Sequence, residues 1–319
     1  DVQLAVCFSC KWGGDAIRFV EHLEGMIFPE AVRFLAERVG VDLPETRDPR
    51  VIAEDRRQRD ERERLLAVCE VAAAFYEAQL RAAPFSELAR GALEERGVTG
   101  ESVERFRLGY APAQWGGLAE HLRAKGVSPA DAELAGLLVP SRHGRDGGAR
   151  GGYHDRFRHR LMFPVMDRAG KVVAFSGRIL PMSEEMPEGI VPPDAGKYIN
   201  SPETPLFTKG EHLYGVHAAR IPIMQRERAI LVEGNFDVVQ MHQHGFTETV
   251  APLGTAFTPE QALLLRRMAD KATLVFDGDG AGRNAARTSH GVCEGAGVMA
   301  RVGVLPPKQD PDSLLRAAG

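Results

Sequence analysis

The sequence has few cysteines and no long apolar run, and both absences restrict the kind of protein it can encode. Four cysteines in 319 residues do not suggest a disulfide framework, which is compatible with a reducing cytoplasm. No apolar stretch approaches the length of a membrane span. The amino terminus also lacks the pattern of a signal peptide. We therefore expect a cytoplasmic protein without a membrane segment.

An overall excess of positive charge is also missing, because the net charge is −4 at pH 7. The total does not indicate nucleic-acid binding, but clustered acids lower it, so the distribution of charge is more informative. Residues 142–178 contain nine Arg and Lys against three Asp, a local excess of six positive charges. The hydrophobic fraction of 44% is ordinary for a globular protein, and the length predicts two or three domains.

The amino-terminal half reads as a short ribbon and several helices around a charged stretch. Apolar residues recur at helical spacing over residues 16–23 and 31–35, and a longer helix is expected over about 64–80. The stretch EDRRQRDERER has no apolar face, which predicts either a solvated linker or the exposed start of a helix. Further along, residues 160–167 and 171–180 predict two strands joined by a turn.

From residue 227 onward the pattern alternates regularly between strand and helix. The strands AILVE, ETVAPLG, ATLVFD and MARVGVLP are separated by segments that read as helices. Such alternation predicts a parallel, doubly wound sheet. We expect an α/β fold class (α+β overall), with domains over residues 1–45, 65–225 and 226–319 and a charged linker over 46–64.

Three acidic clusters follow the ends of predicted strands in the last third of the chain. They are Glu233 with Asp237, Asp277 with Asp279, and Asp310 with Asp312. In a parallel α/β sheet, side chains at the carboxyl ends of the strands gather in one crevice. Six carboxylates there would repel one another unless a divalent cation neutralised them, and oxygen-only clusters suit Mg²⁺ or Mn²⁺. Such metals typically clamp phosphates, which indicates phosphoryl-transfer or nucleic-acid chemistry.

The simpler interpretation of each cluster is a helix cap, a position that Asp favours. It accounts for any single cluster as well as a metal site does, but it explains three clusters after three separate strands less well. Glycines beside two of the clusters also favour a phosphate site. Gly234 permits a sharp turn after Glu233, and Gly278, Gly280 and Gly282 allow a phosphate to approach the backbone.

The pattern of Glu-Gly after one strand and Asp-x-Asp after a later one resembles the Toprim domain of primases, topoisomerases and some nucleases. The flanking phrases are similar to the polymerase core of bacterial DnaG-type primases: ERFRLGYAPAQW, RFRHRLMFPVMDRAGKVVAFSGR, KYINSPETPLFTKGEHLYG, VAPLGTAFTPEQ and DGDGAGRNAA. The segment CFSCKWGGDAIRFVEHLEGMIFPEAVRFLAERVGVDLP resembles the second half of that family's zinc-binding domain. The resemblance implies a Toprim parallel sheet flanked by helices, preceded by a mixed α+β basic subdomain and a partial zinc ribbon.

The resemblance also implies roles for the acids. Glu233, Asp277 and Asp279 would be catalytic, and all six acids of the three clusters would bind Mg²⁺ or Mn²⁺. The family commonly has EGYMD where this chain has EGNFD, so Asn235 and Phe236 alter the packing beside Glu233 but keep the acids.

Basic and amide side chains match the family's nucleotide- and template-contacting positions. They are Arg105 in ERF, Arg178 in SGR, and Lys197 and Asn200 in KYINSPET. Arg and Lys supply positive charge to phosphates without adding to carboxylate repulsion. Asn200 precedes Ser-Pro and is as readily a turn former as a nucleotide contact.

A further group of arginines, Arg156, Arg158 and Arg160, alternates along the sequence. As parts of a strand, the three side chains would share one face. Contact with the template and a plain solvated strand face are equally compatible with this pattern.

Cys7 and Cys10 form half of a tetrahedral zinc site, because thiolates at this spacing suit zinc. The family supplies a further Cys and His upstream, and no residue precedes Asp1 in this sequence. We expect either a chain that is cut inside the zinc-binding domain or a site that is lost, with Zn²⁺ bound in the full-length parent.

The function implied by the resemblance is that of a DNA primase, a nucleotidyltransferase that makes short RNA primers on single-stranded DNA during replication. A primer 3′-hydroxyl would attack the α-phosphate of a nucleoside triphosphate, and pyrophosphate would leave, assisted by two metals. Expected partners are the template, the triphosphates and the RNA product. The replicative helicase and single-strand binding protein would bind through regions mostly absent here. The alternatives are another Toprim enzyme (a nuclease or topoisomerase) and an inactive single-stranded DNA-binding module.

Overall fold

The computed structural model describes residues 5–6, 13–24, 26–41, 49–141, 152–192, 194–254, 256–307 and 309–318. The chain divides into two compact units, Asp1–Glu61 and Arg62–Gly319. Among the described residues, no helix is both long and apolar enough to cross a membrane.

The smaller unit contains a two-stranded antiparallel ribbon and two helices. Its elements are β1 (Ala5–Val6), β2 (Gly13–Gly14), α1 (Ala16–Glu24) and α2 (Phe28–Val39). Pro29 occupies the first turn of α2, where a backbone N–H is not needed, and the helix ends at Gly40 in the left-handed conformation. The ribbon and both helices agree with the sequence-based prediction.

Helix α3 (Pro49–Ala82) contains the charged stretch in its first half, so that stretch is the exposed start of a helix. The described part of residues 46–64, assigned above to a charged linker, is thus helical. Beyond it, Leu65, Val68, Ala72 and Tyr76 recur every three or four residues and are all buried. This apolar stripe packs α3 into the core of the larger unit.

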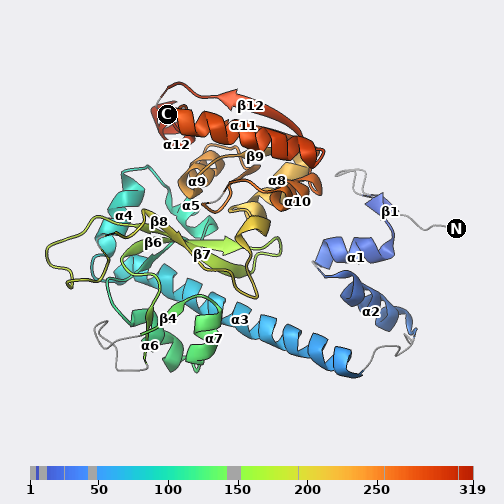
Figure 1. The fold of residues 1–319 in the computed structure, drawn as a ribbon, viewed down its shortest axis with the longest axis horizontal. Coiled ribbons are helices and arrows are strands. Elements are labelled where there is room, and N and C mark those ends of the chain that lie inside the picture. The colour runs from blue at the N-terminus through green and yellow to red at the C-terminus, as the bar shows by residue number, and fades with distance from the viewer. Residues whose placement is uncertain are drawn as a thin grey trace. The chain divides into compact units, whose positions relative to one another are not determined.

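The larger unit begins with a four-stranded antiparallel sheet in the order β3-β6-β7-β8. The strands are β3 (Gly109–Ala111), β6 (Arg160–Met166), β7 (Val172–Ile179) and β8 (Tyr198–Asn200). Strands β6 and β7 form the predicted hairpin, and every residue of β6 is buried. Around the sheet lie α4 (Ser86–Glu94), α5 (Gly100–Arg105), α6 (Gly117–Ala124), α7 (Pro129–Leu134), and the pair β4 (Leu138–Pro140) and β5 (Tyr153–Asp155). Figure 1 shows this sheet between α3 and the second sheet.

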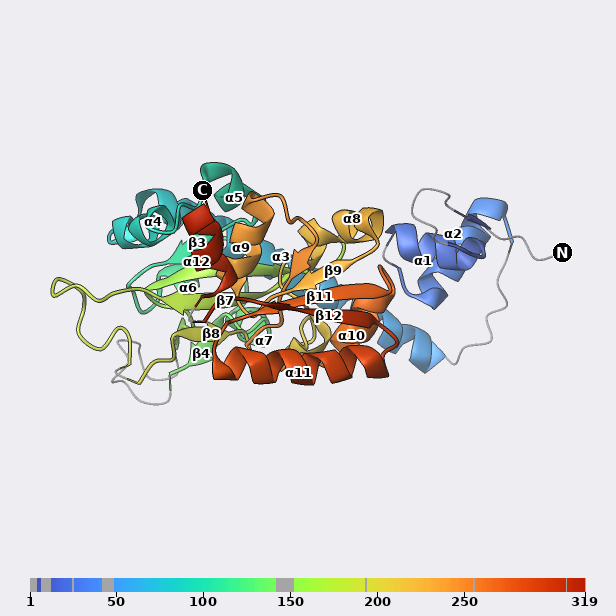
Figure 2. The same ribbon diagram turned by 90° about the horizontal axis from the view of Figure 1, so that it is seen from above.

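The second sheet is parallel throughout, in the order β10-β9-β11-β12. Its strands are β9 (Ala229–Leu231), β10 (Thr249–Val250), β11 (Lys271–Phe276) and β12 (Met299–Val304). The accompanying helices are η1 (Lys209–Glu211), α8 (Val216–Arg226), α9 (Asn235–Gln243), α10 (Pro259–Arg266), α11 (Gly280–Gly295) and α12 (Pro311–Ala318). Helices α10 and α11 lie on one face and α9 and α12 on the other (Figure 2). The predicted parallel, doubly wound sheet is confirmed.

Candidate active site

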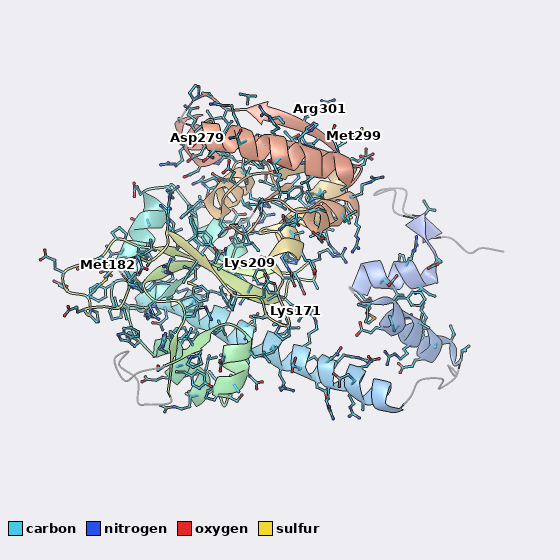
Figure 3. All side chains as sticks on the ribbon, viewed as in Figure 1. Lys171, Met182, Lys209, Asp279, Met299 and Arg301 are labelled. Carbon is cyan, nitrogen blue, oxygen red and sulfur yellow. The ribbon has the colours of Figure 1, made fainter. Side chains whose placement is uncertain are left out.

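The acidic clusters lie at the carboxyl ends of three neighbouring strands. Strand β11 lies between β9 and β12, so the segments that follow these strands emerge side by side. The backbone N–H of Asp277, after β11, donates a 3.1 Å hydrogen bond to Oε1 of Glu233, after β9. Asp279 caps α11 through a 2.8 Å bond from the N–H of Gly282, at the helix end labelled in Figure 3. The predicted cap and the predicted cluster therefore coexist at Asp279.

The loop after β11 is locked against the loop after β12. The N–H of Gly278 donates a 2.9 Å hydrogen bond to the carbonyl of Gln309. A Cβ at Gly278 would lie 2.0 Å from the carbonyl oxygen of Pro306, so only glycine allows this approach. This contact brings Asp310 to the same edge as Asp277.

Asp237 lies in the first turn of α9 and faces the same edge. Its Oδ2 accepts a 3.0 Å bond from the N–H of Gly234, and its Oδ1 accepts a 3.3 Å bond from the N–H of Asp312. Burial, and then the charges of Asp310 and Asp277, raise the pKa of Asp237 to about 7. The carboxyl group of Asp237 is therefore harder to ionise than that of an exposed aspartate.

Electrostatic coupling links the other acids in the same way. Burial, and then the charges of Glu233, Asp310 and Asp279, raise the pKa of Asp277 to about 6, while Lys197 opposes the shift. Burial also acts to raise the pKa of Asp310, but hydrogen bonds from Ser313 and nearby arginines hold it below its ordinary value. The edge therefore concentrates negative charge that a cation would offset.

The donor set fits a divalent cation, although no metal site is preformed. Carboxylate oxygens are the ligands that Mg²⁺ and Mn²⁺ prefer. The pKa of Asp237 and of Asp277 is raised by burial first and then by neighbouring carboxylates, and a cation would relieve that second effect. Within the described part of the chain, no three Asp, Glu, His or Cys side chains stand together as a ready-made site.

Asp312 has partners that the sequence did not suggest. The side chain of Asp312 is only 2% exposed. It forms one ion pair with Arg96 and another with Arg316, whose Nε lies 3.1 Å from Oδ1 of Asp312. Burial raises its pKa, and the two arginines oppose that rise. Arg316 follows Asp312 by four residues on α12, a helical spacing that could have been recognised in the sequence. Arg96 lies 216 residues away in the chain, and no local pattern points to it.

Two of the predicted basic residues lie beside the acids. The exposed Lys197 precedes β8, and its charge acts on Asp277. Arg178 is the last residue but one of β7, opposite Tyr198 of β8, and its guanidinium lies 5.0 Å from the ring centroid of Phe236. Both come from the edge of the antiparallel sheet that faces the start of α9.

Asn200 and Arg105 have different surroundings. The Nδ2 of Asn200 donates a 2.8 Å hydrogen bond to the carbonyl of Leu253, and its buried Oδ1 has no partner among the described residues. Arg105 is exposed at the end of α5, and its charge acts on His242. His242 is near the end of α9, whereas Asp237 is in its first turn. The structure thus does not bring Arg105 to the acidic edge.

Two of the three arginines of RFRHR are engaged by backbone carbonyls, whereas the buried Nε of Arg156 has no hydrogen-bond partner among the described residues. Strand β6 begins only at Arg160, which is 3% exposed and donates a 3.0 Å hydrogen bond to the carbonyl of Gly177. Arg158 donates a 2.8 Å bond to the carbonyl of Ile190, and its guanidinium lies 4.4 Å from the ring centroid of Trp115. These side chains satisfy backbone carbonyls, which a pattern of alternating charges does not reveal.

Cys7 and Cys10 lie outside the described residues, so their predicted zinc site has no structural counterpart here. The other two cysteines, Cys69 and Cys293, are fully buried. Burial raises the pKa of Cys69 to about 12 and that of Cys293 to about 11, as is typical of cysteines that pack in a core.

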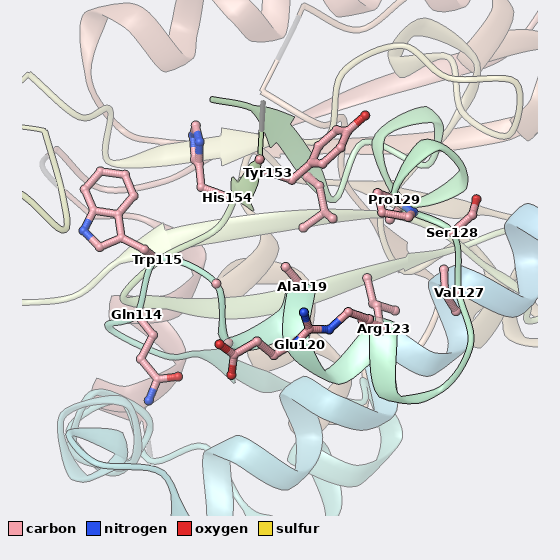
Figure 4. Close-up of a pocket in the computed structure, with 16 residues that line it drawn as sticks. Gln114, Trp115, Ala119, Glu120, Arg123, Val127, Ser128, Pro129, Tyr153 and His154 are labelled. Atoms are coloured by element: carbon pink, nitrogen blue, oxygen red, sulfur yellow. The ribbon is translucent and has the colours of Figure 1, made fainter. Parts of the chain in front are cut away.

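A separate pocket of about 710 Å³ lies away from the acids, between α6, α7 and β5 (Figure 4). Trp115, Glu120, Arg123 and His154 are among its lining residues, and none of the clustered acids is. Its lining reaches Gly152, which adjoins undescribed residues. We therefore assign it no ligand.

Known proteins match the chain along its whole length. Residues 75–220 match the amino-terminal domain of the DNA primase catalytic core, residues 227–302 a Toprim domain, and residues 1–50 a CHC2 zinc finger. A DNA primase of Halalkalibacterium halodurans is 39% identical over 319 residues, which are 100% of this chain and 50% of the relative. The Aquifex aeolicus primase structure, with zinc-binding and RNA polymerase domains, is 31% identical at a TM-score of 0.70, covering 99% of this chain and 70% of its own. The chain belongs to the bacterial DnaG-type DNA primase family.

A structure of a DnaG primase catalytic domain bound to single-stranded DNA is also similar, with a TM-score of 0.68 and 34% identity over 82% of this chain and 76% of that one. The chain spans about half the length of the curated primases that it matches. The matched Toprim and zinc-finger domains indicate divalent-metal and zinc binding in this primase family.

Proposed function

We propose that this chain carries the nucleotidyl-transfer centre of a DNA primase, a DNA-directed RNA polymerase that makes short RNA primers on single-stranded DNA. The observation that supports this most is the meeting of acids from three strand ends, linked directly by the 3.1 Å bond between Glu233 and Asp277. Lys197 and Arg178 border this edge, as a site for phosphates requires.

The proposed ligands of the divalent cations are Glu233, Asp237, Asp277, Asp279 and Asp310. Cations held by these carboxylates would supply Lewis-acid chemistry at the site, lowering the pKa of a 3′-hydroxyl and offsetting negative charge on the phosphates. Glu233, Asp277 and Asp279 form the catalytic set.

The other groups of the site bind and orient the nucleotide. Lys197 and Arg178 supply positive charge to the triphosphate. The unpartnered Oδ1 of Asn200 accepts a hydrogen bond from the nucleotide or its water shell. Arg105, on the outside of α5, is left for contact with the template.

The proposed partners are single-stranded DNA, nucleoside triphosphates and the RNA primer, in the cytoplasm at the replication fork. The DNA-bound relative supports the template, and the zinc-finger match supports Zn²⁺ in the full-length protein. Helicase and single-strand binding protein would contact regions that lie beyond this chain.

The test is primer synthesis by the full-length protein that carries this chain, with Mg²⁺ or Mn²⁺ and a single-stranded template. Asp277→Asn and Asp279→Asn each remove a carboxylate but keep its shape, and Asn can still cap α11. We expect each to reduce synthesis by about a thousandfold, because charge neutralisation is typically among the largest contributions to catalysis.

The matched control is Asp270→Asn, an exposed aspartate that precedes β11 at the opposite edge of the sheet. Its activity should stay within about twofold of the unaltered protein. Normal synthesis by either Asp277→Asn or Asp279→Asn, with unchanged circular dichroism, would contradict the proposed function.

A further inference from the structure

Arg96 connects the segment between α4 and α5 to the acidic edge of the parallel sheet. Its Nη1 is paired with Oδ2 of Asp312, and the two side chains are 25% and 2% exposed. Breaking an arginine–carboxylate pair with so little solvent around it is strongly destabilising, because it leaves a buried charge without a partner.

A second arginine lies beside the other oxygen of the same carboxylate. Arg316 Nε lies 3.1 Å from Oδ1 of Asp312 as an ion pair, although this buried oxygen accepts no hydrogen bond from the described residues. The Nη1 of Arg316 donates a 3.4 Å hydrogen bond to the carbonyl of Glu95. The N–H of Asp312 donates to Asp237 on α9. The first turn of α12 is therefore tied both to α9 and to the segment at residues 95–96.

Helix α9 fixes Arg96 from a third direction. The guanidinium of Arg96 lies 4.4 Å from the ring centroid of Phe236, at a distance suited to cation–π attraction. Gln240 donates a hydrogen bond to the carbonyl of Arg96, and Gln243 donates one of 2.8 Å to the carbonyl of Gly97.

We propose that Arg96 is a positioning residue that holds α12, and that Asp312 receives this ion pair instead of binding a metal ion. Oδ2 of Asp312 is paired with Arg96, and Oδ1 lies within ion-pair distance of Arg316, so a cation at this carboxylate would meet two guanidinium charges. Asp310, two residues earlier, is partly exposed and remains at the rim with Asp277. The ion pair at Asp312 thus sets where Asp310 stands. This assignment rests on the proposed metal-dependent function and refines its ligand set.

The first measurement is the affinity of the chain for Mn²⁺ alone, by electron paramagnetic resonance. Arg96→Met and Asp312→Asn should each raise the Kd by about tenfold, because each releases the same turn of α12. The double variant should bind no more weakly than the weaker single variant, since both substitutions remove one interaction. Arg96→Lys keeps the charge and should recover most of the affinity.

The matched control is Arg228→Met. Glu248 is 0% exposed and shared by Arg226 and Arg228, just as Asp312 is shared by two arginines, but this pair lies at the amino end of β9. Arg228→Met should change the Kd for Mn²⁺ by less than about twofold. If Asp312→Asn abolishes binding while Arg96→Met leaves the Kd unchanged, or if their effects add, Asp312 is a ligand and the proposal is wrong.

The second measurement does not depend on metal. Hydrogen exchange of the backbone amides over residues 312–317 should be at least about tenfold faster in Arg96→Met than in the unaltered chain, and unchanged in Arg228→Met. Equal exchange rates would overturn the positioning role. If the unaltered chain binds no Mn²⁺ while exchange still accelerates in Arg96→Met, the metal function fails and the positioning role stands.

Discussion

At the scale of single residues, the acidic edge depends on close backbone contacts as much as on carboxylates. Gly278 and Gly280 both belong to the DGDG phrase, but their surroundings differ. A Cβ at Gly278 would lie 2.0 Å from the carbonyl oxygen of Pro306, whereas nothing lies within 4 Å of the same position at Gly280. Gly278 thus holds two loops together, and Gly280 only begins α11.

Gly278→Ala should lower the free energy of unfolding by about 1–3 kcal/mol, because the backbone must shift to accept the methyl group. Gly280→Ala should change it by less than about 0.5 kcal/mol, since Ala is a good helix residue with open space around it. Urea denaturation of both variants is the measurement. Equal free energies would show that the contact at Gly278 is not restrictive.

The sequence identified the acids at this scale but not all of their neighbours. Carboxylates after strand ends are predictable because parallel topology brings strand ends together. The role of Arg96 was not predictable from the sequence, because Arg96 and Asp312 are 216 residues apart and their pairing depends on how two subdomains pack. The charges of Arg158 and Arg160 were visible, but their backbone partners were not.

At the scale of elements, α9 lies between the two sheets and is buried along nearly its whole length, from Asn235 to His242. His242 bonds through Nε2 to the carbonyl of Thr249 at 2.9 Å and packs edge-on against Phe106. Burial, with a smaller effect from Arg105, lowers the pKa of His242 to about 4 from an ordinary 6.5. The folded chain therefore takes up this proton less readily than the unfolded chain does.

This shift predicts a loss of stability in acid. The contribution of His242 is fully present above pH 6.5 and is lost as the pH falls toward 4, by about 3 kcal/mol in total. In His242→Leu, the free energy of unfolding from urea titrations should vary less steeply between pH 6.5 and pH 4.5. The same slope in both proteins would assign the acid sensitivity to other groups.

The alternation of strands and helices was predictable at this scale, but the exposure of each helix was not. An amphipathic pattern shows which face of a helix is buried. Helix α9 is buried on nearly all sides, so its sequence has no apolar stripe that would identify one buried face. Strand β10 is also shorter than its apolar run, because Ala251 forms an isolated bridge with Tyr214.

At the scale of the whole molecule, the larger unit has a core of its own. The buried clusters of the larger unit draw their side chains from Leu65 onward. The first half of α3 contributes charge rather than apolar surface. The larger unit should therefore not require the residues before it in order to fold.

Removal of residues 1–61 should leave a chain with one cooperative thermal transition. Its free energy of unfolding should lie within about 1 kcal/mol of that of the same unit in the whole chain, since no part of its own core is lost. Circular dichroism and calorimetry measure both quantities. A gradual transition without a heat-absorption peak would mean that the smaller unit is needed for folding.

The most direct test of the central claim follows two phosphorus labels in one reaction on single-stranded DNA with Mg²⁺ or Mn²⁺. The account predicts that α-labelled triphosphate enters a short RNA product while the γ-label is released in pyrophosphate, one for each bond formed. It also predicts that a chelator stops both. DNA that is shortened without consumption of triphosphate would identify a nuclease. Salt-sensitive DNA binding that does not change when the metal is added or chelated would identify a binding module. Either result would contradict primer synthesis by this acidic edge.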